Sequence, residues 1–235
     1  NQRVAENKKA TSGECVQKGG KNMNTILFDM DGTLFDTEKH YQWAWRKAIA
    51  DAGYELDASE VLKLRSLGAP YNVAQFQEWF GEDVDYHAIR QERINLMKDM
   101  LTNEIPVKPQ VPQTLEKLRQ MGYSMAVVTA TGQEQAVSNL KLAGLLPFFD
   151  RVISSSYVTC GKPAPDVYLH ACEVLAVQPE NCYAVEDSPN GVLSAHAAGC
   201  RTIMIPDLTQ PDAELSRLLY RKLDTFEELI NILEK

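Results

Sequence analysis

Short hydrophobic runs recur along the chain between polar, turn-forming residues, a pattern typical of buried β-strands. From the second run onward, stretches with helical spacing of apolar residues alternate with the strands. This alternation favours an α/β fold with a doubly wound parallel sheet over a β-sandwich. We expect strands over Thr25 to Met30, Ser124 to Ala130, Arg151 to Ser154, Cys182 to Glu186 and Arg201 to Ile205.

The segments between these strands carry signals for helix ends. Glycines at positions 122, 144 and 199 each follow a helical stretch, and glycine is the residue that most often ends a helix. The stretch from Thr225 to Glu228 has the spacing of a capping box and predicts a terminal helix with a structural role. The helices expected between strands span Pro112 to Met121, Gln133 to Ala143, Asp166 to Ala176 and Pro189 to Ala198.

About ninety residues separate the first two predicted strands, far more than a crossover connection needs. Their apolar residues have helical spacing, so we expect residues 38–105 to form a helical second domain joined by two linkers that act as a hinge. Trp43, Trp45 and Trp79 are expected to pack inside it. The apolar residues that share helix faces are Tyr41, Trp45, Ala48 and Ala52, then Val73, Phe76 and Phe80, then Ile89, Leu96, Met97 and Met100.

The first 22 residues are polar and contain no sustained apolar stretch. They therefore indicate a flexible leader and neither a signal peptide nor a membrane anchor. Residues 23–37 and 106–235 would together form the catalytic core, which the helical domain interrupts.

Composition narrows the partners and the compartment. The formal net charge of −8 would repel nucleic acid and anionic membranes, so we expect neither as a partner. The five cysteines are odd in number and form no Cys-x-x-Cys pair, which favours reduced thiols in the cytoplasm over a disulfide framework. We expect a cytoplasmic protein that is monomeric by default and binds a small anionic substrate at a locally positive site.

Two carboxylates follow the first predicted strand. Asp29 and Asp31 lie two residues apart, directly before Gly32 and Thr33. Alternate strand residues point to the same face, so both side chains would project at the carboxyl end of the strand, where open α/β sheets bind ligands. An ordinary acidic turn would have the same composition, so this motif alone does not decide the function.

Three further strand ends carry residues suited to phosphate or metal binding: Thr129, Lys162, and the pair Glu186 and Asp187. Each alone could be an ordinary strand or surface residue. Together and in this order, they make the chain resemble the haloacid dehalogenase superfamily of phosphotransferases, in particular its β-phosphoglucomutase-like branch with its sugar-phosphate phosphatases. The resemblance covers roughly residues 23–206 and implies a Rossmann-like core with an α-helical cap inserted after the first motif.

Acidic residues gathered at neighbouring strand ends repel one another, by about 4 kcal/mol for two unit charges about 4 Å apart at an effective dielectric near 20. Bound Mg²⁺ would remove this repulsion, because it prefers oxygen ligands. The resemblance implies Asp29 and Asp187 as side-chain ligands and the main-chain carbonyl of Asp31 as a third. Glu186 would bind the ion directly or through water.

The same resemblance implies the steps of phosphoryl transfer. Asp29 would attack phosphorus and become an aspartyl phosphate, Asp31 would protonate the leaving group and then activate water, and Lys162 would neutralise the transferring charge. The Thr129 hydroxyl and the main-chain amides of Ala130 and Asp31 would hold phosphoryl oxygens. These roles predict a Mg²⁺-dependent phosphatase that hydrolyses a small phosphorylated metabolite, with a sugar phosphate favoured.

Three other activities fit the resemblance less well. A β-phosphoglucomutase-type mutase would carry a histidine at the position of Tyr41 and an arginine at that of Tyr71, so hydrolysis is favoured, although a shift of one residue would bring His40 into register. Dehalogenases would require a different residue at the position of Asp31. A catalytically silent binding protein is disfavoured because no catalytic residue is missing.

The substrate stays open among sugar phosphates, nucleotide monophosphates, phosphoglycolate and pyrophosphate. The cap would select it, because a cap of this branch closes over the active site. The cap residues that we expect to contact the substrate are Tyr41, Arg65, Tyr71 and Arg93.

Overall fold

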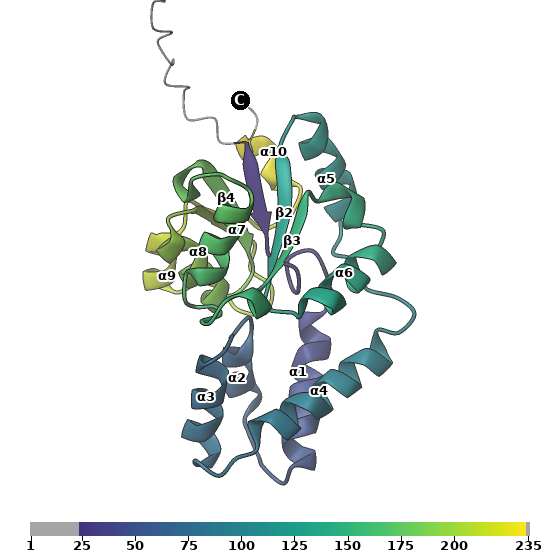
Figure 1. Cartoon of the computed structure of the whole chain (residues 1–235), viewed down its shortest axis with the longest axis vertical. Coiled ribbons are helices and arrows are strands. Elements are labelled where there is room, and N and C mark those ends of the chain that lie inside the picture. Colours follow the sequence, from purple (N-terminus) through teal and green to yellow (C-terminus); the bar gives the residue numbers. More distant parts are fainter. Residues whose placement is uncertain (1–23, 234–235) are drawn as a thin grey trace, which may run out of the picture.

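The computed structural model describes residues 24–233, in which helices surround one parallel sheet (Figure 1). The strand order is β3-β2-β1-β4-β5-β6, so β1 lies in the middle and the winding direction reverses beside it. Sheets of this kind bind their ligands at the carboxyl ends of the strands next to the reversal. The strands are β1 Thr25–Phe28, β2 Ser124–Thr129, β3 Arg151–Ser154, β4 Cys182–Glu186, β5 Arg201–Met204 and β6 Arg221–Lys222.

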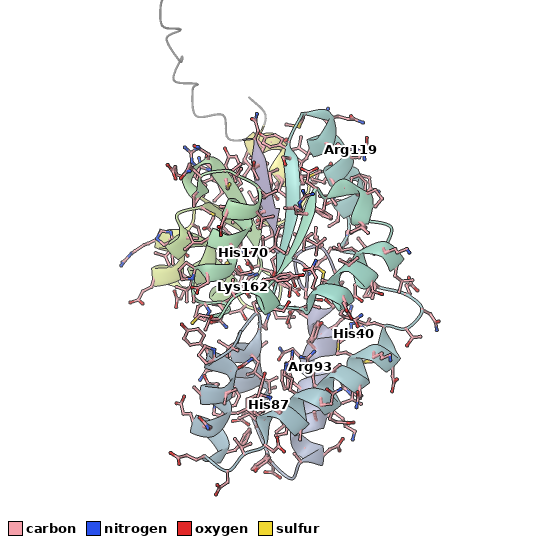
Figure 2. The ribbon with its side chains drawn as sticks, in the orientation of Figure 1. His40, His87, Arg93, Arg119, Lys162 and His170 are labelled. Atoms are coloured by element: carbon pink, nitrogen blue, oxygen red, sulfur yellow. The ribbon has the colours of Figure 1, made fainter. Side chains whose placement is uncertain are left out.

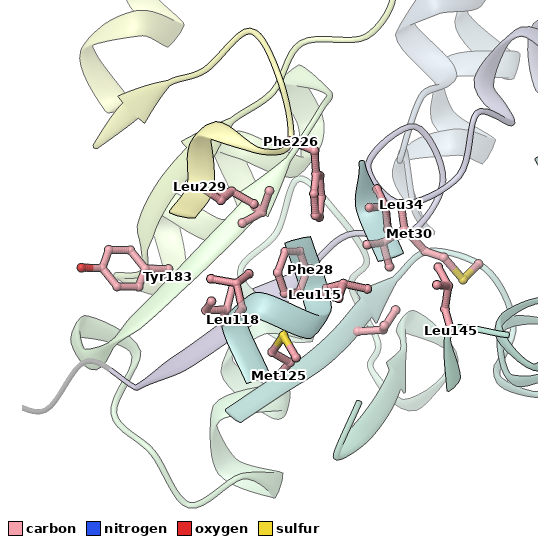
Figure 3. Close-up of a cluster of buried hydrophobic side chains, with 14 of the residues drawn as sticks. Phe28, Met30, Leu34, Leu115, Leu118, Met125, Leu145, Tyr183, Phe226 and Leu229 are labelled. Carbon is pink, nitrogen blue, oxygen red and sulfur yellow. The ribbon is translucent and has the colours of Figure 1, made fainter. Parts of the chain in front are cut away.

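Helices cover both faces of the sheet: α5 Val111–Gln120, α6 Gln133–Leu142, α7 Asp166–Val174, α8 Pro189–Ala198, α9 Ala213–Leu218 and α10 Glu228–Leu233. Alternate residues of β1 point to opposite faces. Ile26 and Phe28 therefore pack with α5, α6 and α10, whereas Leu27 packs with α7 and α8. Figure 3 shows the first of these clusters, in which the Phe28 ring stacks on Phe226 with centroids 5.7 Å apart.

The α/β fold and the parallel sheet predicted from the sequence are confirmed. Strands β3 and β4 have the predicted bounds, and the other predicted strands run one or two residues too far because turns begin inside the apolar runs. Gly122, Gly144 and Gly199 adopt φ values of 86°, 71° and 93°, the left-handed conformation that ends a helix. The short elements α9 and β6 were missed, since they contain too few residues for a periodic pattern.

Four helices between β1 and β2 lie beyond the carboxyl edge of the sheet (Figure 1). We call residues 38–105 the helical insert. Its helices enclose a hydrophobic cluster of their own, in which the rings of Trp45 and Phe76 lie 5.5 Å apart. The elements are α1 Glu38–Asp51, α2 Ala58–Val61, the 3-10 turn η1 Leu62–Leu64, α3 Tyr71–Phe80 and α4 Tyr86–Met100.

Three aromatic and apolar positions of the insert differ from expectation: Trp43, Met100, and Ala52, which is exposed and follows the last residue of α1. Trp43 is 50% exposed, so the prediction that it packs inside is wrong; two residues from Trp45, it lies on the opposite side of α1. Met100 is also exposed, because it is the last residue of α4. No helix within residues 24–233 has the length and apolarity that crossing a bilayer requires.

Candidate active site

A tight turn brings Asp29 and Asp31 to the carboxyl edge of the sheet. The main-chain N–H of Asp29 still bonds to β4, through the Val185 carbonyl at 2.9 Å, and the chain then turns at Gly32. Gly32 has a φ of 87°, and a Cβ there would lie 2.2 Å from Oδ2 of Asp187. Glycine is therefore required for this turn to approach the acidic residues after β4.

Lys162 is a fully buried cation that joins two of the predicted strand ends. Its Nζ donates hydrogen bonds to Oδ1 of Asp29 at 2.6 Å and to Oε1 of Glu186 at 2.7 Å. Burial alone would lower the pKa of the lysine, but the charges of Asp29 and Glu186 outweigh it and raise that pKa. The ammonium group thus stays charged in the site.

Asp29, Glu186 and Asp187 form a buried carboxylate cluster, with one oxygen of each within 4.8 Å of the others. Asp29 Oδ2, Glu186 Oε2 and Asp187 Oδ1 are buried and have no hydrogen-bond partner among the described residues. Burial and the neighbouring carboxylates raise the pKa values of Glu186 and Asp187. Hard oxygen donors with unsatisfied negative charge fit a divalent cation such as Mg²⁺.

The start of α8 shapes the same cluster. A Cβ at Gly191 would lie 1.9 Å from Oε2 of Glu186, so a larger residue would displace that carboxylate. Ser188 caps the helix by accepting a hydrogen bond from the Gly191 N–H at 3.2 Å. The Asn190 side chain donates to the main-chain carbonyl of Arg65 at 2.9 Å. Helix α8 therefore both supports the carboxylates and holds the helical insert.

Asp31 is held by two hydroxyl groups beside the carboxylate cluster. Thr37 donates to Oδ1 and Thr131 to Oδ2, each at 2.8 Å. Burial raises the pKa of Asp31 to about 6, even though both hydrogen bonds lower it. A carboxyl group with this pKa can give up and recover a proton near neutral pH, as a general acid and base must.

The predicted phosphate-binding residues follow β2. Thr129 is buried, and its hydroxyl accepts a hydrogen bond from the Thr131 N–H at 3.0 Å. Thr129 and Ala130 line a cavity of about 750 Å³ between the sheet edge and the helical insert, together with Asp29 and Asp31. The loop after β2 thus faces the same space as the acidic turn after β1.

Arg65 reaches from the helical insert into the carboxylate cluster. Its side chain is fully buried and forms ion pairs with Asp187 and, at 3.3 Å, with Oε2 of Glu38. It also donates to the Thr209 hydroxyl at 3.0 Å. Arg65 lines the cavity as expected of a residue of the insert, but its guanidinium is already bound by two carboxylates.

Tyr41 and Arg93 line the part of the cavity formed by the insert. The Arg93 guanidinium lies 5.3 Å from the centroid of the Tyr41 ring and 4.9 Å from that of Trp45. Arg93 lies within the insert and Lys162 at the adjoining edge of the sheet (Figure 2). Tyr71, the first residue of α3, is 38% exposed and does not line the cavity, although the next residue, Asn72, does; its expected contact with substrate is therefore not supported by its position.

Two main-chain hydrogen bonds join the insert to the loop that carries Lys162. The Gly68 N–H donates to the Lys162 carbonyl at 2.8 Å, and the Gly161 N–H donates to the Ala69 carbonyl at 2.7 Å. A Cβ at Gly68 would lie 2.6 Å from the Cα of Gly161, so the two segments of the chain can approach this closely only because both residues are glycine. The insert is therefore in direct contact with the backbone of Lys162.

Four residues with contacts in the site were not identified as site residues from the sequence: Thr37, Glu38, Thr131 and Tyr168. Tyr168 is fully buried in the first turn of α7 and donates to Oε1 of Glu186 at 2.5 Å. Glu38 begins the predicted helical domain and Thr131 follows the predicted strand that ends at Ala130, so their places in the sequence could have indicated them. Tyr168 offered no such signal, because a buried tyrosine on an amphipathic helix is ordinary core.

Comparison with known proteins supports the same assignment. A family model described as haloacid dehalogenase-like hydrolase matches residues 23–199. The fructose-1-phosphate phosphatase YqaB of Escherichia coli (strain K12) is 33% identical over 178 residues, which cover 74% of this chain and 92% of that protein. A phosphorylated carbohydrates phosphatase of Thermotoga maritima is 32% identical and aligns over 77% of this chain and 84% of its own length.

Solved structures share the fold. CbbY from Rhodobacter sphaeroides in complex with phosphate superimposes with a TM-score of 0.72 and 27% identity, covering 88% of this chain and 96% of CbbY. The β-phosphoglucomutase of Clostridium difficile has a TM-score of 0.74 at 20% identity, covering 88% and 92%. The latter shows only that the fold is shared. These matches confirm the superfamily and the phosphoric monoester hydrolase class that the resemblance implied, and the chain belongs to the haloacid dehalogenase-like hydrolases.

Proposed function

We propose that this chain is a phosphatase that hydrolyses a small phosphorylated metabolite, with a sugar phosphate as its substrate class. One observation carries the proposal: Asp29, held by Lys162, lies beside Asp31, whose pKa of about 6 suits a proton donor. The relatives named for phosphatase activity on fructose 1-phosphate and phosphorylated carbohydrates support the substrate class.

The residues that follow the strands would each take a different role in the reaction. Asp29 would attack the phosphorus atom and become an aspartyl phosphate, while Asp31 donates a proton to the departing alkoxide. Asp31 would then take a proton from a water molecule as the water oxygen attacks the phosphorus atom, which breaks the bond to Asp29 and releases phosphate. Lys162, the Thr129 hydroxyl and the main-chain amides of Ala130 and Asp31 would hold the phosphoryl oxygens.

Mg²⁺ is proposed as the cofactor, held by the side chains of Asp29 and Asp187, by the main-chain carbonyl of Asp31, and by Glu186 either directly or through water. The unpartnered buried oxygens of the three side chains support this ligand set. When bound, the ion supplies positive charge that offsets the acidic cluster and the substrate phosphate. Arg65 would keep Asp187 in position from the other side, through its ion pair.

We also propose that residues 23–37 and 106–235 act as the catalytic core and that residues 38–105 act as its cap. The separate hydrophobic cluster of the insert and its contacts to Lys162 support this division. Tyr41, Arg65 and Arg93 are the proposed residues of the cap that face substrate, because all three line the cavity. The leader predicted over residues 1–22 lies outside the described residues.

Hydrolysis is proposed over the β-phosphoglucomutase reaction. Burial raises the pKa of the Tyr41 phenol, so the group stays neutral where a mutase of this branch would carry a histidine. We propose that the protein is a monomer in the cytoplasm and that it acts on neither nucleic acid nor membrane. Within the described residues the cysteines are free, at positions 160, 172, 182 and 200, in keeping with reduced thiols.

A phosphate-release assay over a panel of sugar phosphates, nucleotide monophosphates, phosphoglycolate and pyrophosphate tests the proposal. We expect Mg²⁺-dependent release that is greatest with a sugar phosphate and is abolished in Asp29→Asn. A coupled assay with β-glucose 1-phosphate runs beside it. Formation of glucose 6-phosphate without free phosphate would overturn hydrolysis in favour of the mutase reaction.

A further inference from the structure

Tyr168 makes a polar contact to the carboxylate cluster. Its side chain is fully buried in the first turn of α7, and its hydroxyl donates to Oε1 of Glu186 at 2.5 Å. The Lys162 ammonium lies 5.3 Å from the centroid of the same ring. Tyr168 therefore contacts both Lys162 and the partner of Lys162 without lining the cavity itself.

These contacts give the two carboxylate oxygens of Glu186 different surroundings. Oε1 accepts hydrogen bonds from Lys162 at 2.7 Å and from Tyr168, whereas Oε2 has no partner among the described residues. Oε2 occupies the space left open by the missing side chain of Gly191, since a Cβ there would lie 1.9 Å from it. Two donors on one oxygen thus fix which oxygen of Glu186 stays unpaired.

In Asp29 and Asp187, too, one carboxylate oxygen has a partner and the other has none among the described residues. Lys162 binds Oδ1 of Asp29 and Arg65 binds Oδ2 of Asp187, and the remaining oxygen of each is buried with no partner within residues 24–233. Tyr168 differs from Lys162 and Arg65 because it is neutral. A neutral donor orients a carboxylate without adding positive charge that would repel an incoming cation.

We propose that Tyr168 is a positioning residue for divalent-cation binding, which holds Glu186 so that Oε2 remains free for the ion. The inference rests on the proposed function, since it takes the carboxylate cluster as the Mg²⁺ site. Hydrogen bonds to metal-binding carboxylates typically change metal affinity 10–100-fold when removed. The competing explanation is that Tyr168 only fills the hydrophobic layer around α7, which phenylalanine would do equally well.

The test is a calorimetric titration of the full chain with MgCl₂ in the absence of substrate, comparing wild type with Tyr168→Phe. We expect the Kd for Mg²⁺ to rise about tenfold in the variant. Tyr183→Phe is the matched control: this tyrosine is also buried, but it lies on β4 in the opposite hydrophobic cluster, and its loss should leave the Kd unchanged. An unchanged Kd in Tyr168→Phe would overturn the proposal.

A double-mutant cycle with Glu186→Gln separates positioning from a general loss of structure. If Tyr168 acts through Glu186, adding Tyr168→Phe to Glu186→Gln causes no further rise in the Kd. An equal further rise in both backgrounds would show a purely structural role and overturn the proposal. Phosphate release by the wild type is measured separately. If the wild type releases phosphate but Tyr168→Phe binds Mg²⁺ with the wild-type Kd, this inference is contradicted and the proposed function is not.

Discussion

Thr131 donates its hydroxyl hydrogen to Oδ2 of Asp31 at 2.8 Å, across 100 residues of sequence. Thr37 holds the other oxygen of the same carboxylate at the same distance. The two donors come from the loop after β2 and from the entrance to the helical insert. Asp31 is thus held from two sides, and its orientation depends on the loop after β2 and the start of α1 staying together.

Thr131→Val should shift the pH dependence of the reaction. The hydrogen bond from Thr131 favours the charged form of Asp31 and lowers its pKa, so its loss raises that pKa above about 6. A hydrogen bond to a charged group contributes about 1.5–3 kcal/mol, or about one to two pKa units. The alkaline limb of kcat/KM, where the proton donor is lost, should move up by about one unit. Thr131→Ser keeps the hydroxyl and should retain the wild-type profile; a Val variant with that same profile would contradict the assignment.

Asp31→Asn should stabilise the metal-free protein at alkaline pH while abolishing activity. The pKa of Asp31 rises from 3.8 to about 6 on folding, so the native state is favoured while the group is protonated. That stability is fully present below pH 3.8 and is lost as pH rises to about 6, a cost of about 3 kcal/mol. Asparagine avoids the cost, so urea unfolding in EDTA should show Asp31→Asn more stable at pH 8. The advantage should shrink toward pH 4; an equal difference at both pH values would rule out this titration.

The sheet edge could be predicted because strand periodicity and motif order act locally. Asp29, Thr129 and Glu186 each end an apolar run, and parallel pairing then brings their strand ends together. They meet Lys162 because its loop lies at the same edge of the sheet. The role of each remains a prediction, but the proximity of the four residues is a consequence of the fold.

Contacts across the insert could not be predicted in this way. The ion pair between Arg65 and Asp187 joins residues 122 positions apart and depends on how the loop after η1 packs against the sheet edge. Tyr71 was assigned to the cavity from its position in a family motif, yet α3 begins there and turns it outward. Such contacts are decided by tertiary packing, which no periodicity in the sequence encodes.

Mg²⁺ should raise the thermal stability of the protein, because it would bind only the folded carboxylate cluster. At a concentration 100 times its Kd, a ligand adds about 2.7 kcal/mol, and for a chain of this size about 1 kcal/mol corresponds to a Tm increase of about 2–4 °C. We therefore expect an increase of about 5–10 °C in differential scanning calorimetry. Asp187→Asn should remove most of this increase, whereas Asp224→Asn, at an exposed site, should retain it. Equal increases in both variants would place the ion elsewhere.

Arg65→Met should destabilise the protein strongly, although it removes a residue outside the proposed reaction steps. The guanidinium is fully buried between Asp187 and Glu38, and desolvation already raises the pKa of both carboxylates. Removing one partner of a buried ion pair leaves its charge uncompensated, at a cost of about 3–5 kcal/mol. Methionine keeps the aliphatic volume, so the loss measured by urea unfolding reports mainly on charge.

Lys63→Met supplies the matched control two residues earlier. Lys63 pairs with Glu60 at 2.7 Å, but its side chain is 55% exposed, and exposed pairs contribute about 0–1 kcal/mol. The two substitutions remove the same unit of charge within and directly after η1, so the difference between them isolates burial beside the carboxylates. Similar losses in both would mean that Asp187 and Glu38 are protonated without Arg65 and that the ion pair contributes little. A large loss confined to Arg65→Met would instead mean that the helical insert supplies the cation that keeps the acidic edge of the sheet folded.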